Sequence, residues 1–138
     1  MDRMFLVMAS LFAGSGVALG AFGAHALQRK IPVERLATFE TGVRYQLWHA
    51  LALFAVVFVR AWRPVSVGNV YAPLVSLSSG SPATILSGWL FVAGIVLFSG
   101  SLYGLALTGV RRFGVVAPLG GLCLLGGWFA LAFATATR

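Results

Sequence analysis

Long apolar runs separated by short polar interruptions dominate the pattern of this chain. The first run covers residues 4–27 without a formal charge. A helix rises about 1.5 Å per residue, so a run of this length can cross the hydrocarbon core of a bilayer, which is about 30 Å thick. Further apolar runs predict spans over residues 40–60, 86–110 and 115–137. The pattern therefore predicts an all-α fold, a four-helix transmembrane bundle with both termini on one side of the membrane.

The connections between the predicted spans differ in length and composition. A helical pattern begins upstream of the second span, near Pro32. It predicts an amphipathic segment that leads into this span at the membrane interface. Residues 61–83 form the one long connection, and their prolines and glycines repeatedly break regular structure. We expect a tight turn at residues 111–114, and Pro118 falls in the first turn of the last span, where a missing amide costs little.

Composition indicates an integral membrane protein formed by a single domain, residues 1–138. Hydrophobic residues make up 59% of the chain and charged residues only 9%. A soluble domain usually carries about a quarter charged residues, which cover its water-facing surface. The first apolar run is longer than the hydrophobic region of a signal peptide, about 7–15 residues, so we expect it to be retained as a membrane span.

The net charge of +7 does not indicate nucleic-acid binding, because the basic residues sit mostly at the edges of apolar runs. That is where the positive-inside rule and lipid headgroups place them, whereas a nucleic-acid-binding protein gathers them on one soluble face. The first and third connections carry Arg29, Lys30, Arg35, Arg111 and Arg112, and the opposite side carries Arg3, Arg60, Arg63 and Arg138. This small excess favours the first and third connections in the cytoplasm and both termini outside.

Small residues recur at helical intervals in the predicted spans, which is typical of tight helix packing in membranes. The first span has a GxxxG pair, and the fourth has small residues at heptad intervals. The glycines expected at helix contacts are Gly16, Gly20, Gly94, Gly100, Gly104, Gly120 and Gly127. The same pattern would also suit an oligomer interface or a lipid groove.

Polar residues near the first connection form a candidate binding cluster. Ionisable groups within membrane segments are costly and are therefore functional candidates. Consecutive antiparallel helices place the end of the first span beside the start of the second, so we expect His25 to approach the second span. Glu40 and Arg44 stand four residues apart with the acid first, the favourable order for an ion pair. The cluster comprises His25, Glu40, Arg44, Tyr45, Gln46 and His49.

Three interpretations of this cluster compete. The first is a hydrogen-bonded polar lock between helices, the second a proton- or solute-handling site, and the third a metal or bis-histidine haem site. Two histidines can hold haem iron but are too few for structural zinc. The sequence contains no GxSxG, HExxH or Walker motif. We therefore expect no enzymatic activity, no catalytic residue, no metal site and no cofactor.

Two motifs carry a family resemblance. The segments GAFGAHAL, residues 20–27, and FETGVRYQLWHAL, residues 39–51, resemble the YgdD/YwdK-like family of small bacterial inner-membrane proteins, classified as domain of unknown function 423. The resemblance implies a four-helix protein of the bacterial inner (plasma) membrane with no established activity. It also implies that the six cluster residues belong to the family's polar signature. Residues 61–83 look longer than is usual for the family.

These observations together favour a small polytopic, non-enzymatic membrane protein with a structural or accessory role. We expect membrane lipid as a partner, and either a second copy of the chain or a larger membrane complex as a further one. Proton-linked or small-solute transport at the polar cluster and a haem-binding redox subunit remain the alternatives.

Overall fold

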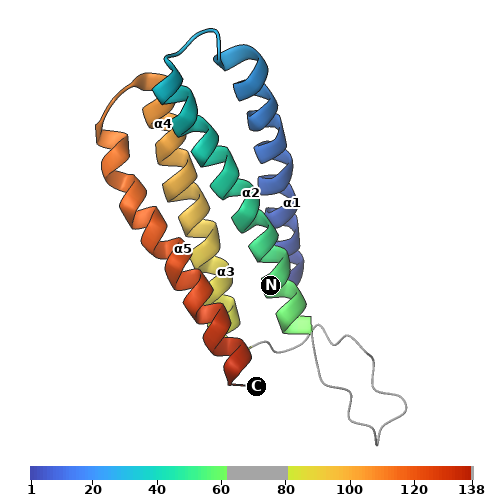
Figure 1. Ribbon diagram of the computed structural model, residues 1–138. Helices are drawn as coiled ribbons and strands as arrows, with labels where there is room; N and C mark the ends of the chain where they lie inside the picture. The colour runs from blue at the N-terminus through green and yellow to red at the C-terminus, as the bar shows by residue number, and fades with distance from the viewer. Residues whose placement is uncertain (62–80, 138) are drawn as a thin grey trace, which may run out of the picture.

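The computed structural model describes residues 1–61 and 81–137 and consists of four long helical segments (Figure 1). The first is α1 with a π-helical turn, η1, at its end, and the third consists of α3, a central π-helical turn η2, and α4. The element bounds are α1 Asp2–Phe22, η1 Gly23–Leu27, α2 Val33–Ala61, α3 Pro82–Gly94, η2 Ile95–Ser99, α4 Gly100–Thr108 and α5 Arg112–Ala136.

All four segments are long and apolar enough to cross a membrane. The most apolar 18-residue stretch has a mean hydropathy of 1.9 in Asp2–Leu27, 1.4 in Val33–Ala61, 2.1 in Pro82–Thr108 and 1.9 in Arg112–Ala136. The described residues contain helices and no strand. The predicted all-α, four-helix transmembrane fold is therefore confirmed. The predicted long connection falls mainly on residues 62–80, which lie outside the described residues.

The boundary between the third and fourth spans differs from the prediction. The third span ends at Thr108 because Gly109 adopts a left-handed conformation, with a φ of 74°, that glycine tolerates without steric cost. Helix α5 then begins at Arg112, so the turn covers residues 109–111 rather than 111–114. Pro118 consequently lies inside α5 and not in its first turn. Membrane helices tolerate an internal proline because neighbouring groups satisfy the freed carbonyl.

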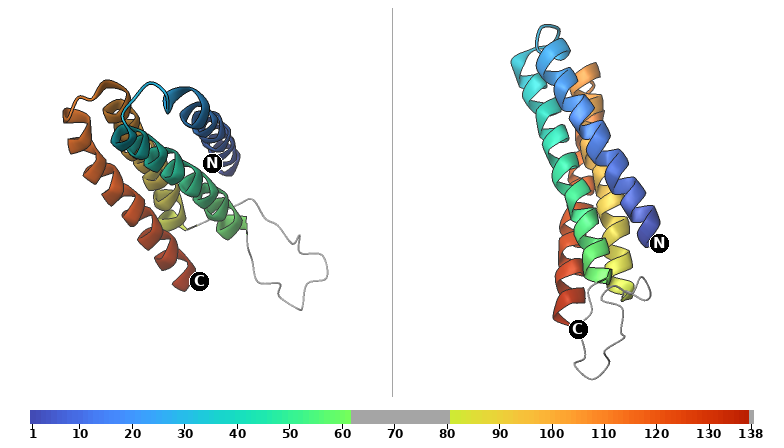
Figure 2. Two further views of the ribbon diagram at one scale, coloured as in Figure 1. Left: turned by 45° about the horizontal axis from the view of Figure 1, so that its top comes forward. Right: turned by 90° about the vertical axis from the view of Figure 1, so that its right-hand side faces the viewer.

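Helix α2 and the third span form the centre of the bundle. Helix α1 packs against α2 on one side, and α5 packs against the third span on the other. Figures 1 and 2 show α1 and α5 at opposite edges, with both termini at one end and the two short connections at the other. Helix α2 is accordingly the most buried of the four spans.

Two apolar clusters fill the interior. The larger one lies toward the termini and is built around Phe5, Leu53 and Phe91, none of which is exposed. The smaller one lies toward the short connections and includes Phe39 and Val43. The stretch of α2 between the two clusters, from Val43 to Leu53, carries buried polar side chains.

Glycines bring the helix backbones close together, as the spacing of small residues indicates. A Cβ at Gly120 would meet the backbone of Phe98, and one at Gly127 would lie 2.7 Å from the ring of Phe91. A Cβ at Gly94 would meet Leu124. Helix α5 therefore packs on the third span through backbone contact at several levels.

The remaining predicted contact glycines divide into two groups. A Cβ at Gly16 would lie 2.8 Å from Leu47, at Gly20 3.4 Å from Val43, and at Gly104 2.8 Å from Phe113. Gly100 is the exception, since a Cβ there would meet nothing within 4 Å. Its place on the exposed side of α4 accounts for the difference.

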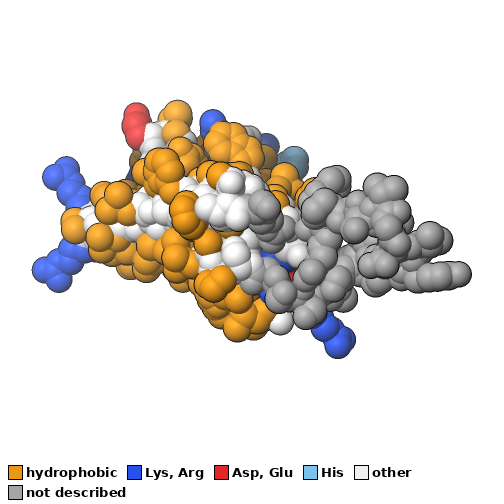
Figure 3. Space-filling view, turned by 90° about the horizontal axis from the view of Figure 1, so that it is seen from below, with side chains coloured by type: hydrophobic (Ala, Val, Ile, Leu, Met, Phe, Trp, Pro, Cys, Tyr) orange, Lys and Arg blue, Asp and Glu red, His pale blue; other side chains and the backbone are white. Residues whose placement is uncertain are grey.

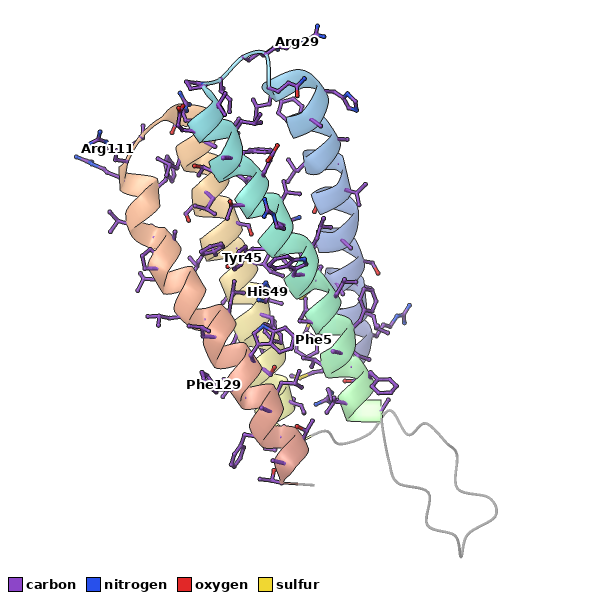
Figure 4. All side chains as sticks on the ribbon, viewed as in Figure 1. Phe5, Arg29, Tyr45, His49, Arg111 and Phe129 are labelled. Carbon is purple, nitrogen blue, oxygen red and sulfur yellow. The ribbon has the colours of Figure 1, made fainter. Side chains whose placement is uncertain are left out.

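The outer surface of the bundle is apolar. Leu11 on α1 and Leu122 and Phe129 on α5 are exposed, and Figure 4 shows Phe129 pointing away from the bundle. Hydrophobic side chains make up most of the described surface in the end-on view of Figure 3, with Lys and Arg projecting at the periphery. Arg29 and Arg111 project from the end that carries the short connections. This surface suits contact with lipid chains along the sides and with headgroups at the ends.

Candidate functional site

Helix α2 carries four polar side chains that reach other helices. Arg35 lies near its start, Gln46 and His49 near its middle, and Arg60 near its end. The last three are buried. Because a polar group buried without a partner is costly in a membrane, the partners of these side chains decide what the interior can do.

Gln46 joins three helices through its amide group. Its Nε2 donates to the carbonyl oxygen of Phe12 at 2.8 Å and to Oγ of Ser15 at 2.9 Å, both on α1. Its Oε1 accepts a hydrogen bond from the hydroxyl of Tyr103 on α4 at 2.9 Å. Both amide protons and one oxygen lone pair are therefore used. Gly16 lies at this contact, where a Cβ would be 3.4 Å from Gln46 Nε2.

His49 lies next to this contact on α2 and is tied to α5. Its Nδ1 lies 2.8 Å from the carbonyl oxygen of Tyr45, and Nε1–H of Trp128 donates to its Nε2 at 3.2 Å. A carbonyl only accepts and an indole N–H only donates, so the ring carries its proton on Nδ1 and is neutral. Figure 4 shows Tyr45 and His49 near the middle of the bundle. Both ring nitrogens are occupied in helix contacts.

Aromatic rings surround His49. The Tyr45 ring stacks on it with centroids 5.8 Å apart, and Phe91 lies at 5.7 Å and Trp128 at 6.1 Å. Phe98 packs on the other side of Tyr45 at 4.7 Å. The imidazole is therefore held in one orientation by rings from α2, α3 and α5.

Arg60 ties three helices together at the end of the bundle near the termini. Its Nε forms an ion pair with Oδ1 of Asp2 on α1, and its Nη1 donates to Oγ1 of Thr84 on α3 at 3.4 Å. Asp2 and Arg60 are each 8% exposed. This contact, which we call the Asp2–Arg60–Thr84 tie, anchors the start of α1 to the end of α2.

Arg35 caps the third span at the opposite end of the bundle. Its Nε donates to the carbonyl oxygen of Ala106 at 2.7 Å, and its guanidinium lies against Gly109. A cation at a helix C-terminus is favourable because it satisfies free carbonyls and opposes the helix dipole. Arg35 therefore connects the start of α2 to the end of α4.

His25 does not join the other cluster residues. Gly23 and Leu27 of η1 are buried, whereas His25 between them is exposed. Residues 23 and 27 lie four apart and share one face of the helical turn, whereas residue 25, midway between them, points to the opposite side. Within residues 1–61 and 81–137, no hydrogen bond or ion pair involves the His25 side chain. Its assignment as a binding residue stays a prediction.

Glu40 and Arg44 line an open groove between the end of α1 and the first half of α2, which we call the α1/α2 groove. Its volume is about 330 Å³, and Phe39, Val43 and Leu47 form its apolar part. The predicted ion pair between Glu40 and Arg44 is absent among the described residues. Both side chains are exposed on the outer surface of the bundle, so packing does not hold them in the orientation that a direct ion pair needs.

The arrangement of the histidines does not suit haem. His25 is exposed near the end of the first span, and His49 is buried with both ring nitrogens engaged. Axial ligation by His49 would have to break its contact with Trp128 or with Tyr45. The part of the chain that the structure describes also contains no group of three or more His, Cys, Asp or Glu residues placed to hold a metal ion.

Sequence reasoning identified Gln46 and His49 but missed most of their partners. Nothing in the sequence singles out Tyr103 and Trp128 within their apolar spans, although their polar atoms need partners away from water. Asp2 and Arg60 offered a signal, because they carry opposite charges at the ends of consecutive antiparallel spans that meet on one side. The sequence gives no such signal for Arg35, because its partner is a backbone carbonyl, which every residue has.

Comparison with known proteins places the chain in a family. The family model described as "Protein of unknown function (DUF423)" matches residues 19–121. UPF0382 membrane protein YwdK of Bacillus subtilis is 39% identical over 132 residues, which cover 96% of this chain and 95% of that protein. UPF0382 membrane protein SSP2132 of Staphylococcus saprophyticus is 35% identical over 133 residues, covering 96% and 97%. No solved structure gave a significant match. The chain is a membrane protein that belongs to the DUF423 family.

Proposed function

We propose that this protein is a non-enzymatic accessory protein of the bacterial inner membrane that acts through its lateral surface. In this role it binds membrane lipid or a larger membrane complex beside it. The relatives named above come from bacteria and are named as membrane proteins, which supports the location. The apolar sides of the bundle and the α1/α2 groove supply the surface.

The observation that carries the proposal is the pairing of the interior polar groups. Gln46, His49 and Arg60 each bond to another helix, and every side-chain nitrogen of Gln46 and His49 has a partner, which for Nδ1 of His49 is the Tyr45 carbonyl within α2. A solute or proton pathway needs polar groups that can exchange partners with the substrate or with water. Because these side chains already bond within the bundle, their arrangement favours a structural role for the interior.

Close helix packing supports the same proposal. At Gly94 and Gly120 the third span and α5 meet with no space for a single Cβ atom. A transporter that alternates access must separate such contacts during each cycle. A four-helix unit joined at backbone distance has little capacity for that motion.

Proton flux through proteoliposomes tests this proposal against transport. Vesicles containing the purified protein and an internal pH-sensitive dye should acidify no faster than empty vesicles after an external pH drop. The His49→Ala variant should behave in the same way. A leak in the unmodified protein that His49→Ala abolishes would overturn the proposal in favour of proton-linked transport.

A further inference from the structure

The α1/α2 groove combines an apolar floor with two opposite charges. Phe39, Val43 and Leu47 form the apolar part, while Glu40 and Arg44 line the groove from the same helix. Within the described residues, the Glu40 carboxylate and the Arg44 guanidinium have no protein partner. The groove therefore offers one anionic and one cationic site to a ligand from outside the bundle.

Glycines give the α1 side of the groove its shape. A Cβ at Gly23 would lie 3.2 Å from the Phe39 ring, and one at Gly20 would lie 3.4 Å from Val43. At these two positions, one on α1 and one on η1, the first span presents only backbone to the groove. An apolar floor beside a wall without side chains at these positions suits an alkyl chain.

The depth of the two charges in the bilayer follows from the length of α2. Its 29 residues span about 43 Å, against about 30 Å for the hydrocarbon core, so about 6 Å extends beyond the core at each end. For a centred helix, Glu40 lies about 4 Å and Arg44 about 10 Å inside the edge of the core. Long side chains at this depth extend toward the headgroups. A ligand that neutralises both charges there removes a desolvation cost.

The order of the charges along α2 matches one class of lipid headgroup. Glu40 lies nearer the membrane surface and Arg44 lies deeper. In a zwitterionic phospholipid the phosphate lies nearer the acyl chains and the amine lies farther out. Arg44 can therefore donate to the phosphate oxygens while the Glu40 carboxylate accepts from the amine.

We propose that the α1/α2 groove binds a phospholipid with a primary-amine, zwitterionic headgroup, of the phosphoethanolamine type, from the leaflet on the side of the short connections. The proposal rests on the lipid-binding role proposed above. A protonated primary amine has N–H groups that can donate hydrogen bonds to a carboxylate, whereas the methylated amine of phosphocholine has no N–H group. A phosphoglycerol headgroup carries no cation and leaves Glu40 unneutralised.

Native mass spectrometry of the purified protein tests the selectivity directly. The protein is mixed with equal amounts of phosphatidylethanolamine, phosphatidylcholine and phosphatidylglycerol with identical acyl chains, and the retained lipid is counted. We expect phosphatidylethanolamine to be retained about tenfold more than phosphatidylcholine, the ratio that about 1.4 kcal/mol gives. Equal retention of the two, or preferential retention of phosphatidylglycerol, would overturn the inference.

Two variants separate ordered recognition from general charge attraction. The exchange Glu40→Arg with Arg44→Glu keeps the net charge and reverses the order, and we expect it to abolish the preference for phosphatidylethanolamine. Arg112→Gln removes an exposed cation at the start of α5, away from the groove, and should leave the preference unchanged. A preference that survives the exchange would also overturn the inference. Vesicle leak and lipid selectivity are separate readouts, so failure of the proposed function and failure of this inference remain distinguishable.

Discussion

Buried polar side chains of α2 have partners on other helices, and these partners determine which substitutions the interior tolerates. Gln46 bonds to α1 and α4, His49 to α5, and Arg60 to α1 and α3. Interhelical hydrogen bonds in membrane proteins contribute on average about 0.6 kcal/mol and at most about 1.7 kcal/mol. For the uncharged contacts of Gln46 and His49, single substitutions should therefore shift stability modestly, and the measurements must resolve differences of that size.

The hydrogen bond between Tyr103 and Gln46 should be measurable with a double-mutant cycle. Tyr103→Phe removes the hydroxyl and keeps the ring, and Gln46→Leu removes the amide at similar volume. We expect a coupling free energy of about 1 kcal/mol from reversible unfolding in mixed micelles. Ser10→Ala serves as the control, since Ser10 is exposed and bonds only within its own helix. Zero coupling would contradict the contact.

His49 should be a neutral imidazole with its proton on Nδ1. Nitrogen-15 NMR of histidine-labelled protein distinguishes this tautomer from the Nε2–H form and from imidazolium, and His25 supplies an exposed reference in the same spectrum. In Trp128→Phe the Nε2 shift should change, because its donor is lost. His49→Ala should lower the free energy of unfolding by about 1 kcal/mol. An Nε2–H signal for His49 in the unmodified protein would show that Trp128 is not the donor.

At the scale of elements, glycine stripes set the distance between helices. Gly120 and Gly127 lie one heptad apart on α5 and meet Phe98 and Phe91, which are one heptad apart on the third span. Ser87 adds a hydrogen bond across the same interface, donating to the carbonyl oxygen of Gly127 at 2.8 Å. The two helices are therefore fixed in register by both shape and bonding.

A Cβ at Gly120 should be poorly tolerated, because it would meet backbone atoms of Phe98 that cannot move like a side-chain tip. We expect Gly120→Ala to destabilise the protein by about 1–3 kcal/mol, as overpacking typically does. Gly100→Ala is the matched control, since a Cβ there meets nothing within 4 Å. It should be neutral or slightly stabilising because alanine favours helix over glycine. Thermal unfolding of both variants checks the pair, and equal melting temperatures would argue against close packing at Gly120.

The elements themselves could be predicted from the sequence because each apolar run is long and has charged or helix-breaking residues at its ends. The heptad of small residues on α5 also indicated which face would pack. The contacts of the candidate site were harder to predict from the sequence than the helices. His25 lies midway between the buried residues Gly23 and Leu27 and therefore on the opposite side of the helix, and which side of the first span packs at this level depends on tertiary contacts. Contacts such as Trp128 to His49 depend on how nonconsecutive helices pair.

At the scale of the whole molecule, polar contacts at three heights hold the four helices together. Arg35 lies near the short connections, Gln46 and His49 near the middle, and the Asp2–Arg60–Thr84 tie near the termini. Helix α2 contributes to every one of them. The bundle is thus organised around its second span, with α1 and α5 held at opposite edges (Figure 2).

Breaking one side of the ion pair between Asp2 and Arg60 should be more damaging than removing both charges. Asp2→Asn leaves the buried Arg60 guanidinium without its counterion, and we expect a loss of about 3–5 kcal/mol. The double variant Asp2→Asn with Arg60→Met should recover a large part of this loss, because no buried charge remains. Unfolding free energies of the single and double variants provide the test. A double variant as unstable as Asp2→Asn alone would show that the charges are not coupled.

The Asp2–Arg60–Thr84 tie also has a consequence for how the protein is made. Asp2 emerges from the ribosome long before Thr84, so α1 enters the bilayer without the residues that fix its start. Its carboxylate must stay hydrated at the membrane surface until the second span brings Arg60 to it, and Thr84 joins Arg60 only when the third span has been inserted. Closure of the tie then marks the moment when three spans are present with the correct topology. A variant chain in which the third span inserts inverted would leave Asp2 and Arg60 without Thr84, and membrane quality control would meet an incompletely closed bundle.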